Sequence, residues 1–264
     1  MQSTLEMKNI TIEFPGVKAL NQVHFSTKTG KIQALIGANG AGKSTLMKVL
    51  SGAYNHYTGE IVLDGESLNI RSPKDAQDAG IQIVYQEVDT ALIPNLTIAE
   101  NIMLMDTVHH MGKKQWMNWK TLHQKAAQIL ADMNITLSTK KLVSELSLAE
   151  KQMILIARAV SNRCKYLILD EPTAPLSHTE TTELFRIAHE LKRQNVGIIF
   201  ISHRLPEIFE ICDEITVMRN GEFVVKENIS ETTHRIKWWS TCLAKSWRNS
   251  FRKRIRELET QFLK

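Results

Sequence analysis

The chain has 264 residues and a formal net charge of +5, and 43% of its residues are hydrophobic. This length suits one good core with room for a subdomain, and the composition is that of a folded globular protein. No apolar stretch approaches the length of a membrane span, and the opening residues lack the basic-then-apolar pattern of a secretory signal. Cys164, Cys212 and Cys242 are far apart, which predicts free thiols in a reducing compartment.

The positive charge is concentrated at the C-terminal end. Residues 234–264 carry nine Lys or Arg and two Glu, whereas residues 1–233 carry 24 basic and 26 acidic residues. A basic chain often indicates polyanion partners. That inference applies here to the last segment alone, so we expect no nucleic-acid partner for the body of the protein.

The predicted elements begin with a half-buried strand at 4–14 and its partner at 21–27. A buried strand at 31–37 precedes a helix at 44–53. An edge-like strand with a turn at Asp64 and Gly65 follows at 59–68. Further buried strands are predicted at 81–86, 166–171, 197–203 and 214–221.

Helical patterns lie between these strands. The clearest is 178–194, where apolar residues recur at helical spacing and Ser177 and Glu180 are spaced as a capping box. Strands that alternate with helices predict an α/β protein with a parallel sheet. The stretch 97–161 breaks this alternation, so we expect a mostly helical insertion there.

The sequence GANGAGKST, residues 37–45, matches the pattern G-x-x-x-x-G-K-[ST] between a buried strand and a helix. Its glycines let the backbone approach a phosphate, and its N–H groups form an anion site that the helix dipole reinforces. We expect Lys43 to reach the β- and γ-phosphates of a nucleotide and the Ser44 hydroxyl to coordinate Mg²⁺. The expected phosphate loop comprises Gly37, Ala38, Asn39, Gly40, Ala41, Gly42, Lys43, Ser44 and Thr45.

The sequence YLILDEPTA, residues 166–174, supplies two adjacent acids at the end of an apolar strand. Ligands of open α/β sheets bind at the carboxyl ends of the strands, where these acids lie. Asp170 is expected to hold Mg²⁺ directly or through water. Glu171 is expected to orient and deprotonate the attacking water.

The order FPGVKAL, GANGAGKST, VYQE, LSLAEKQM, LILDEPTA, FISH resembles the nucleotide-binding subunit of ATP-binding cassette (ABC) transporters over about residues 4–233. The resemblance implies a P-loop NTPase with a RecA-like parallel sheet core, an N-terminal antiparallel β subdomain and an inserted helical subdomain. It also implies that Phe14 stacks on adenine, that Gln86 contacts Mg²⁺ and water and senses the permease, and that His203 lies near the γ-phosphate. Each residue alone has an ordinary structural explanation, and their order and spacing favour the functional one.

The family's signature, LSGGQ, is altered in this chain. Ser147 is kept, whereas Leu148, Ala149 and Glu150 replace the two glycines and the glutamine. Side chains at these positions should restrict close backbone approach to a phosphate, and the acid adds negative charge near it. Ser177 likewise stands where the D-loop usually ends in aspartate.

The phosphate loop (37–45) and the strand that ends in Asp170 and Glu171, known as the Walker motifs, are intact, whereas the signature is altered. This combination is similar to the N-terminal cassette of the tandem ATPases that serve monosaccharide importers. The resemblance implies ATP hydrolysis that drives uptake of a sugar such as ribose, galactose or xylose. It implies transmembrane permease subunits, a second cassette, and a periplasmic or extracellular sugar-binding protein that acts indirectly. It also implies a peripheral position on the cytoplasmic face of the membrane. ATPases for nucleoside uptake are the nearest competitor.

In that group a second cassette follows, whereas residues 234–264 are basic and rich in tryptophan. We expect residues after about Thr233 to be out-of-frame translation, because synonymous codons can be chosen whose shifted reading resembles the family there. A genuine basic arm for membrane or RNA is the rival interpretation. Two further hypotheses are a truncated module that binds ATP and hydrolyses little, and a cassette of DNA repair or translation, whose coiled-coil or paired-cassette markers the sequence lacks.

Overall fold

The computed structural model describes residues 2–85, 87–105, 107, 118–161 and 163–229. The chain divides into two compact units, Met1–Glu227 and Asn228–Lys264. The first unit carries the fold described below. Gln86, Cys242 and the segment 234–264, all of which figured in the expectations above, lie outside the described residues.

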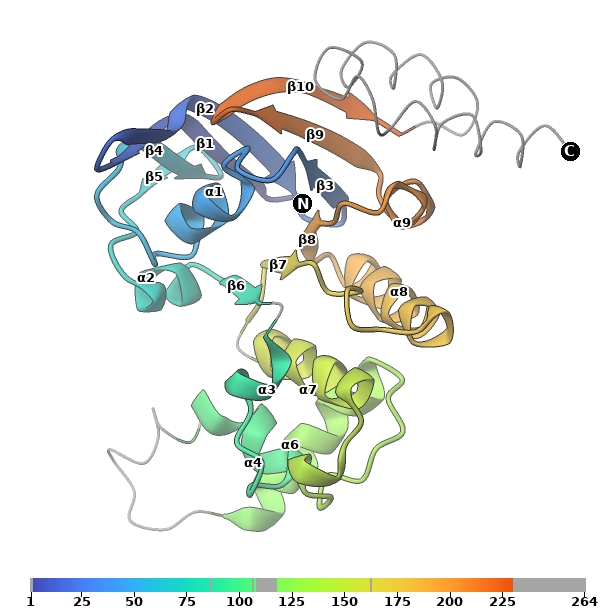
Figure 1. Ribbon diagram of the computed structural model, residues 1–264. Helices are drawn as coiled ribbons and strands as arrows, with labels where there is room; N and C mark the ends of the chain where they lie inside the picture. Colours follow the sequence, from blue (N-terminus) through green and yellow to red (C-terminus); the bar gives the residue numbers. More distant parts are fainter. Residues whose placement is uncertain (1, 86, 106, 108–117, 162, 230–264) are drawn as a thin grey trace, which may run out of the picture. The chain divides into compact units, whose positions relative to one another are not determined.

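A six-stranded sheet runs through the first unit in the order β10-β9-β3-β8-β7-β6 (Figure 1). Its pairs β3–β8, β3–β9, β7–β8 and β6–β7 are parallel. Strands covered on both faces read as continuous apolar runs, which is why these segments were predictable. The strands are β3 (Ile32–Ile36), β6 (Ile81–Val84), β7 (Tyr166–Asp170), β8 (Gly197–Ile201), β9 (Glu214–Arg219) and β10 (Glu222–Asn228).

The second sheet has four strands in the order β2-β1-β4-β5, and its pairs are antiparallel. The strands are β1 (Thr4–Phe14), β2 (Val17–Lys28), β4 (Thr58–Leu63) and β5 (Glu66–Leu68). Asp64 and Gly65 both have positive φ in the turn between β4 and β5, as the sequence predicted. The α/β class with an N-terminal antiparallel sheet is therefore confirmed.

Helices lie in several of the connections between the strands (Figure 1). The described part of the chain between β6 and β7 contains five helices, α3, α4, α6, η1 and α7, joined by non-helical segments. α3 begins before the helical stretch that the sequence predicted, and α8 confirms the predicted helix with its capping box. The helices are α1 (Lys43–Leu50), α2 (Pro73–Asp78), α3 (Val88–Ala91), α4 (Ile98–Ile102), α6 (Trp119–Asp132), η1 (Val143–Glu145), α7 (Leu148–Val160), α8 (His178–Arg193) and α9 (Leu205–Ile211).

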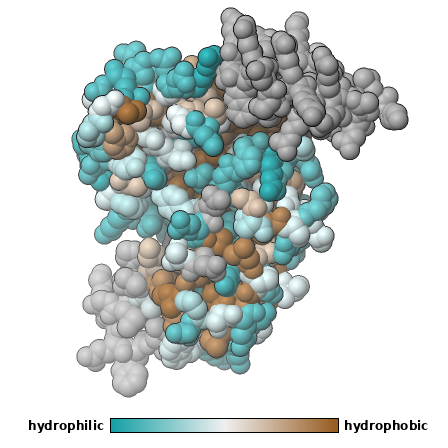
Figure 2. Space-filling view, viewed as in Figure 1, coloured by the Kyte–Doolittle hydropathy of each residue, from teal (hydrophilic) through white to brown (hydrophobic). Residues whose placement is uncertain are grey.

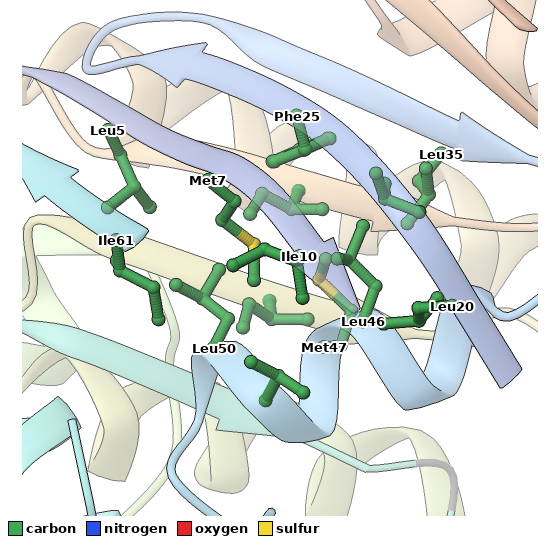
Figure 3. Packing of buried hydrophobic residues seen from close by; sticks show 14 of the residues in the cluster. Leu5, Met7, Ile10, Leu20, Phe25, Leu35, Leu46, Met47, Leu50 and Ile61 are labelled. Atoms are coloured by element: carbon green, nitrogen blue, oxygen red, sulfur yellow. The ribbon is translucent and has the colours of Figure 1, made fainter. Parts of the chain in front are cut away.

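The hydrophobic core packs against one face of α1, the helix that follows the phosphate loop (Figure 3). Leu46, Met47 and Leu50 of α1 are fully buried and belong to one cluster with Leu5 and Ile10 of β1. Full burial of such a side chain stabilises the fold by about 1.5–3 kcal/mol. The core therefore holds α1 in place behind the phosphate loop.

The turn between β4 and β5 is linked to the N-terminal residues through Asp64. Its carboxylate accepts hydrogen bonds from the Ser3 hydroxyl at 2.7 and 2.8 Å, and from the Thr4 backbone N–H at 2.7 Å. The Ser3 bond first, and then the Thr4 bond, lower the pKa of Asp64 below its ordinary value of 3.8. A lowered carboxyl pKa adds stability above the unfolded-state value, and this stability is lost as the pH falls through the folded-state value.

Asp64→Asn should therefore lower the free energy of unfolding at pH 7. Because Asp64 is exposed, we expect a loss of only about 0.5–1 kcal/mol. Urea denaturation of the parent and the variant, at pH 7 and in acid, measures the difference, which should shrink as the pH falls through the folded-state pKa of Asp64. An equal difference at both pH values would contradict this account.

Candidate functional site

The phosphate loop joins the end of β3 to the start of α1, and its shape depends on glycine at two positions. Gly42 has φ +95°, and a Cβ there would lie 2.9 Å from the Ala19 carbonyl oxygen. A Cβ at Gly37 would lie 2.4 Å from the Met218 carbonyl oxygen of β9. Any side chain at either position would push the loop away from its neighbouring strands, so the tight turn requires glycine.

Lys43, the first residue of α1, lies across this loop. Its ammonium group donates hydrogen bonds to the carbonyl oxygens of Gly37 at 2.8 Å and Ala38 at 3.2 Å. Burial lowers the pKa of Lys43, and the negative charges of Glu171 and Asp170 oppose this effect. The loop, the lysine and the acid pair thus form one electrostatic unit.

Asp170 ends β7, and the Ser44 side chain lies close enough to affect its carboxyl group. Burial raises the pKa of Asp170, and the neighbouring charge of Glu171 raises it further. This excess of negative charge favours a cation, and a hydroxyl beside a carboxylate offers the oxygen ligands that Mg²⁺ prefers.

The donor set near Ser44 and Asp170 fits a magnesium ion that keeps phosphate and water ligands. Among the residues that the structure describes, no group of three or more His, Cys, Asp and Glu could hold a metal. Magnesium in phosphate sites is usually bound by one or two protein ligands together with the phosphates of the substrate. The residues present are therefore sufficient for Mg²⁺ bound with a nucleotide.

Glu171 and His203 lie at the ends of adjacent parallel strands, and their side chains meet. The Glu171 Oε2 atom lies 2.8 Å from the His203 Nδ1 atom. Glu171 has φ +51°, a left-handed conformation that costs a residue with a side chain about 1–3 kcal/mol. Its N–H donates to the Ile201 carbonyl of β8 at 3.0 Å, which fixes this turn of the chain. The structure thus brings together two residues that the sequence singled out separately.

Phe14 lies at the end of β1 and is half-buried. Its ring centroid lies 5.2 Å from that of Tyr54 and 5.3 Å from that of His56, both in edge-to-face geometry. Sequence reasoning did not select Tyr54 and His56, because they are about forty residues away along the chain. The sequence signal that could have identified them is the occurrence of aromatic side chains in the loop after α1.

The altered signature lies at the start of α7, where Ser147 and Glu150 form a capping box. The Ser147 N–H donates to Glu150 Oε2 at 2.8 Å, and the Glu150 N–H donates to the Ser147 hydroxyl at 3.2 Å. Lys141 lies 3.4 Å from the other carboxylate oxygen. The acid does not point away from the helix, because it accepts a hydrogen bond from the amide of Ser147. Leu148 and Ala149 form the first turn of the helix.

Glu207 is a further polar residue that sequence reasoning missed. It lies on α9, is 9% exposed and bonds to residues near both Glu171 and His203. The signal in the sequence was an acid on the buried side of a short helix. Gln86, which was expected to contact Mg²⁺, lies outside the described residues.

The fold and the phosphate loop define this chain as a P-loop nucleoside triphosphatase. The model of the family described as "ABC transporter" matches residues 20–174, more than half of the chain. The chain therefore belongs to the ABC transporter family. It is an ATPase cassette of the kind that binds ATP with Mg²⁺ and hydrolyses it.

Solved cassettes share this fold. A nucleotide-free ATP-binding cassette from an ABC transporter is 25% identical with a TM-score of 0.76, and the match covers 87% of this chain and 92% of that chain. The cassette MJ1267 in its ADP conformation is 26% identical with a TM-score of 0.74, over 86% and 91% of the two chains. CbiO1 from Clostridium perfringens, part of the transporter complex CbiONQ, is 24% identical with a TM-score of 0.73, over 85% and 88%, and shows likeness of fold alone.

Proposed function

We propose that this chain energises an importer for a monosaccharide, as the cassette with intact Walker motifs in an asymmetric pair. The observation that carries the proposal is the contrast between two sites. In the Walker site, Lys43 lies close to the phosphate loop and to the acids Asp170 and Glu171. In the signature, the Glu150 side chain accepts a hydrogen bond from the Ser147 N–H at the start of its own helix. The segments FPGVKAL and LTIAENIML and the sequence around Ser147 resemble the N-terminal cassettes of tandem sugar-importer ATPases, which supports the choice of cargo.

For the nucleotide, we assign binding roles to the loop and its neighbours. Phe14 stacks on adenine, and Lys43 and the loop amides from Gly37 to Thr45 hold the phosphates. Ser44, Asp170 and Gln86 are the proposed protein ligands of Mg²⁺. When bound, the ion neutralises phosphate charge and orients the terminal phosphate.

For hydrolysis, we assign the proton-accepting role to Glu171. Its carboxylate accepts a proton from the attacking water. His203, whose Nδ1 atom lies 2.8 Å from Glu171 Oε2, orients this carboxylate and is assigned a place near the γ-phosphate. The left-handed backbone of Glu171 and its N–H bond to the Ile201 carbonyl hold the residue in a conformation from which its side chain reaches His203. The rate of hydrolysis depends on this position, because a general base must be held in a fixed geometry relative to the water.

For the opposite half of the dimer, we propose that a second, different cassette supplies the signature. The Ser147 amide at the start of α7 already donates to Glu150, so it is not free for a phosphate. The Glu150 carboxylate also repels a γ-phosphate there. A pair of identical chains would therefore close around ATP less readily than a mixed pair, and we expect the purified chain to show only a basal hydrolysis rate.

ABC cassettes partner with transmembrane permeases, and this chain exposes apolar side chains suited to such a partner. Tyr85, Ile93 and Met105 are 42%, 40% and 36% exposed. Figure 2 shows hydrophobic residues among polar ones over the part of this face formed by the helices between β6 and β7. Such exposed patches are typical of protein–protein contacts. We propose that they meet the permease, with a sugar-binding protein acting indirectly through it.

Within the part of the chain that the structure describes, every helix is too short or too polar to cross a bilayer. We propose a peripheral position on the cytoplasmic face of the membrane, where the permease would hold the cassette. We assign the cassette to residues 1–233, with a helical subdomain at about 97–161.

Glu171→Gln removes the proposed base while keeping the size of the side chain. We expect the hydrolysis rate of the purified chain to fall by about 10²–10⁴-fold, with the Kd for MgATP within about threefold of the parent. Phosphate release and equilibrium titration measure the two quantities. A variant that hydrolyses ATP at the parental rate would contradict the assignment, and a parent that binds MgATP without any turnover would support a purely binding role.

Uptake assays test the cargo. Cells that lack the gene should lose uptake of labelled ribose, galactose or xylose, and the parental gene should restore it, whereas the Glu171→Gln gene should not. Loss of nucleoside uptake with normal sugar uptake would overturn the monosaccharide assignment in favour of a nucleoside importer.

The combined variant Leu148→Gly, Ala149→Gly and Glu150→Gln tests the asymmetry. Glutamine at position 150 can keep the capping box with Ser147, whereas two glycines in the first turn of α7 should lower the free energy of unfolding by about 1–2 kcal/mol. In a Glu171→Gln background, the variant should self-associate with ATP more than the same chain with its natural signature, as measured by sedimentation velocity. Equal ATP-dependent dimerisation of both chains would show that the natural signature is competent.

A further inference from the structure

We propose that Glu207 is a positioning residue that holds the Glu171–His203 pair in register. It does so by joining the loop after Glu171 to the loop that carries His203. The proposal rests on the roles assigned above to Glu171 and His203, and it extends them to a residue outside the phosphate loop and the acid pair.

One carboxylate oxygen of Glu207 bonds to both loops. Its Oε2 atom accepts hydrogen bonds from the Thr173 hydroxyl at 2.7 Å and from the Ser202 hydroxyl at 3.0 Å. Thr173 is two residues after Glu171, and Ser202 directly precedes His203. Thr173 and Ser202 are each 1% exposed, so water does not compete for these bonds.

Arg204 closes the network from the other side. Its guanidinium donates to Glu207 Oε1 at 3.2 Å, and to the carbonyl oxygen of Thr173 at 3.4 Å. Its backbone N–H donates to the Ser202 hydroxyl at 3.0 Å. The hydroxyl of Ser202 therefore receives one bond and gives another, so its orientation is fixed. Hydrogen bonds of both side-chain and backbone groups therefore connect the loop after Glu171 with the loop that carries His203.

The pair needs such support because little else holds it. Glu171 has a left-handed backbone, and the side chain of His203 is 66% exposed. Apart from the contact between them, the loops are linked by the strand pairing of Asp170 with Ile201 and by the Glu171 amide bond. A displacement of about 1 Å in a catalytic group can lower a rate by about a hundredfold.

Stability alone does not account for a charged group at this place. Glu207 is nearly buried, but its ion-pair partner Arg204 has a side chain that is 42% exposed, and such a pair contributes little stability. A branched carboxylate, however, can accept from two hydroxyls and an arginine at once, which apolar groups cannot do. The bonding of Glu207 therefore indicates a role in positioning the two loops and not a role in filling the core.

Thr173→Val and Thr173→Ser form a matched pair for the test in the full chain. Valine keeps the shape and removes the hydroxyl, whereas serine keeps the hydroxyl. We expect Thr173→Val to lower kcat for ATP by about ten- to a hundredfold with KM unchanged, and Thr173→Ser to stay within about twofold of the parent. Ser202→Ala, which removes the other hydroxyl, should behave like Thr173→Val. A purely structural role would lower the thermal midpoint without separating kcat from KM.

The ring nitrogens of His203 give a second readout that does not depend on turnover. In ¹⁵N spectra of histidine-labelled chains, Thr173→Val and Ser202→Ala should move the His203 Nδ1 resonance towards its position in Glu171→Gln, whereas Thr173→Ser should leave it unchanged. Folded valine and alanine variants with the parental resonance and parental kcat would overturn the inference. Parental hydrolysis by Glu171→Gln would instead overturn the proposed role of Glu171, and the His203 resonance would still decide whether Glu207 holds the pair.

Discussion

The site depends on one constraint, which is that the phosphate loop is fixed at both ends by the core. The strand before the loop, β3, is buried along its whole length, and Leu46, Met47 and Leu50 hold α1 after it. Gly37 packs against the carbonyl of Met218 so closely that no side chain fits. Backbone N–H groups bind phosphate well only if they need not reorganise, so this rigidity is the physical basis of nucleotide binding.

Parallel pairing of β7 with β8 accounts for the rest of the geometry. It places the residues that follow Asp170 and Ile201 at one edge of the sheet, where the side chains of Glu171 and His203 meet 2.8 Å apart. The Walker side of this chain is therefore built from adjacent, buried elements. In the signature at the start of α7, by contrast, the Ser147 N–H already donates its hydrogen bond to Glu150 of the same helix. This contrast is the physical argument for a partner that differs from this chain.

Most of the scaffold could be predicted from the sequence, and the fine geometry of the site could not. β3, the loop and α1 have strong local signals, namely an apolar run, glycines and helical spacing, and the capping box at Ser177 was readable from residue types alone. The contact of Phe14 with Tyr54, and the bonds from Glu207 to Thr173 and Ser202, join segments far apart in the chain. The direction of the Glu150 carboxylate depends on a side-chain rotamer, which sequence spacing does not determine.

The most direct test of the account is the affinity of Lys43→Ala for MgATP, measured by isothermal titration calorimetry with circular dichroism to verify the fold. The Lys43 ammonium lies at hydrogen-bond distance from two loop carbonyls, where a bound phosphate would meet it. Loss of a charge-assisted hydrogen bond costs about 1.5–3 kcal/mol, so the account predicts an affinity about ten- to a hundredfold weaker than that of the parent. A folded variant that binds MgATP as tightly as the parent would contradict it.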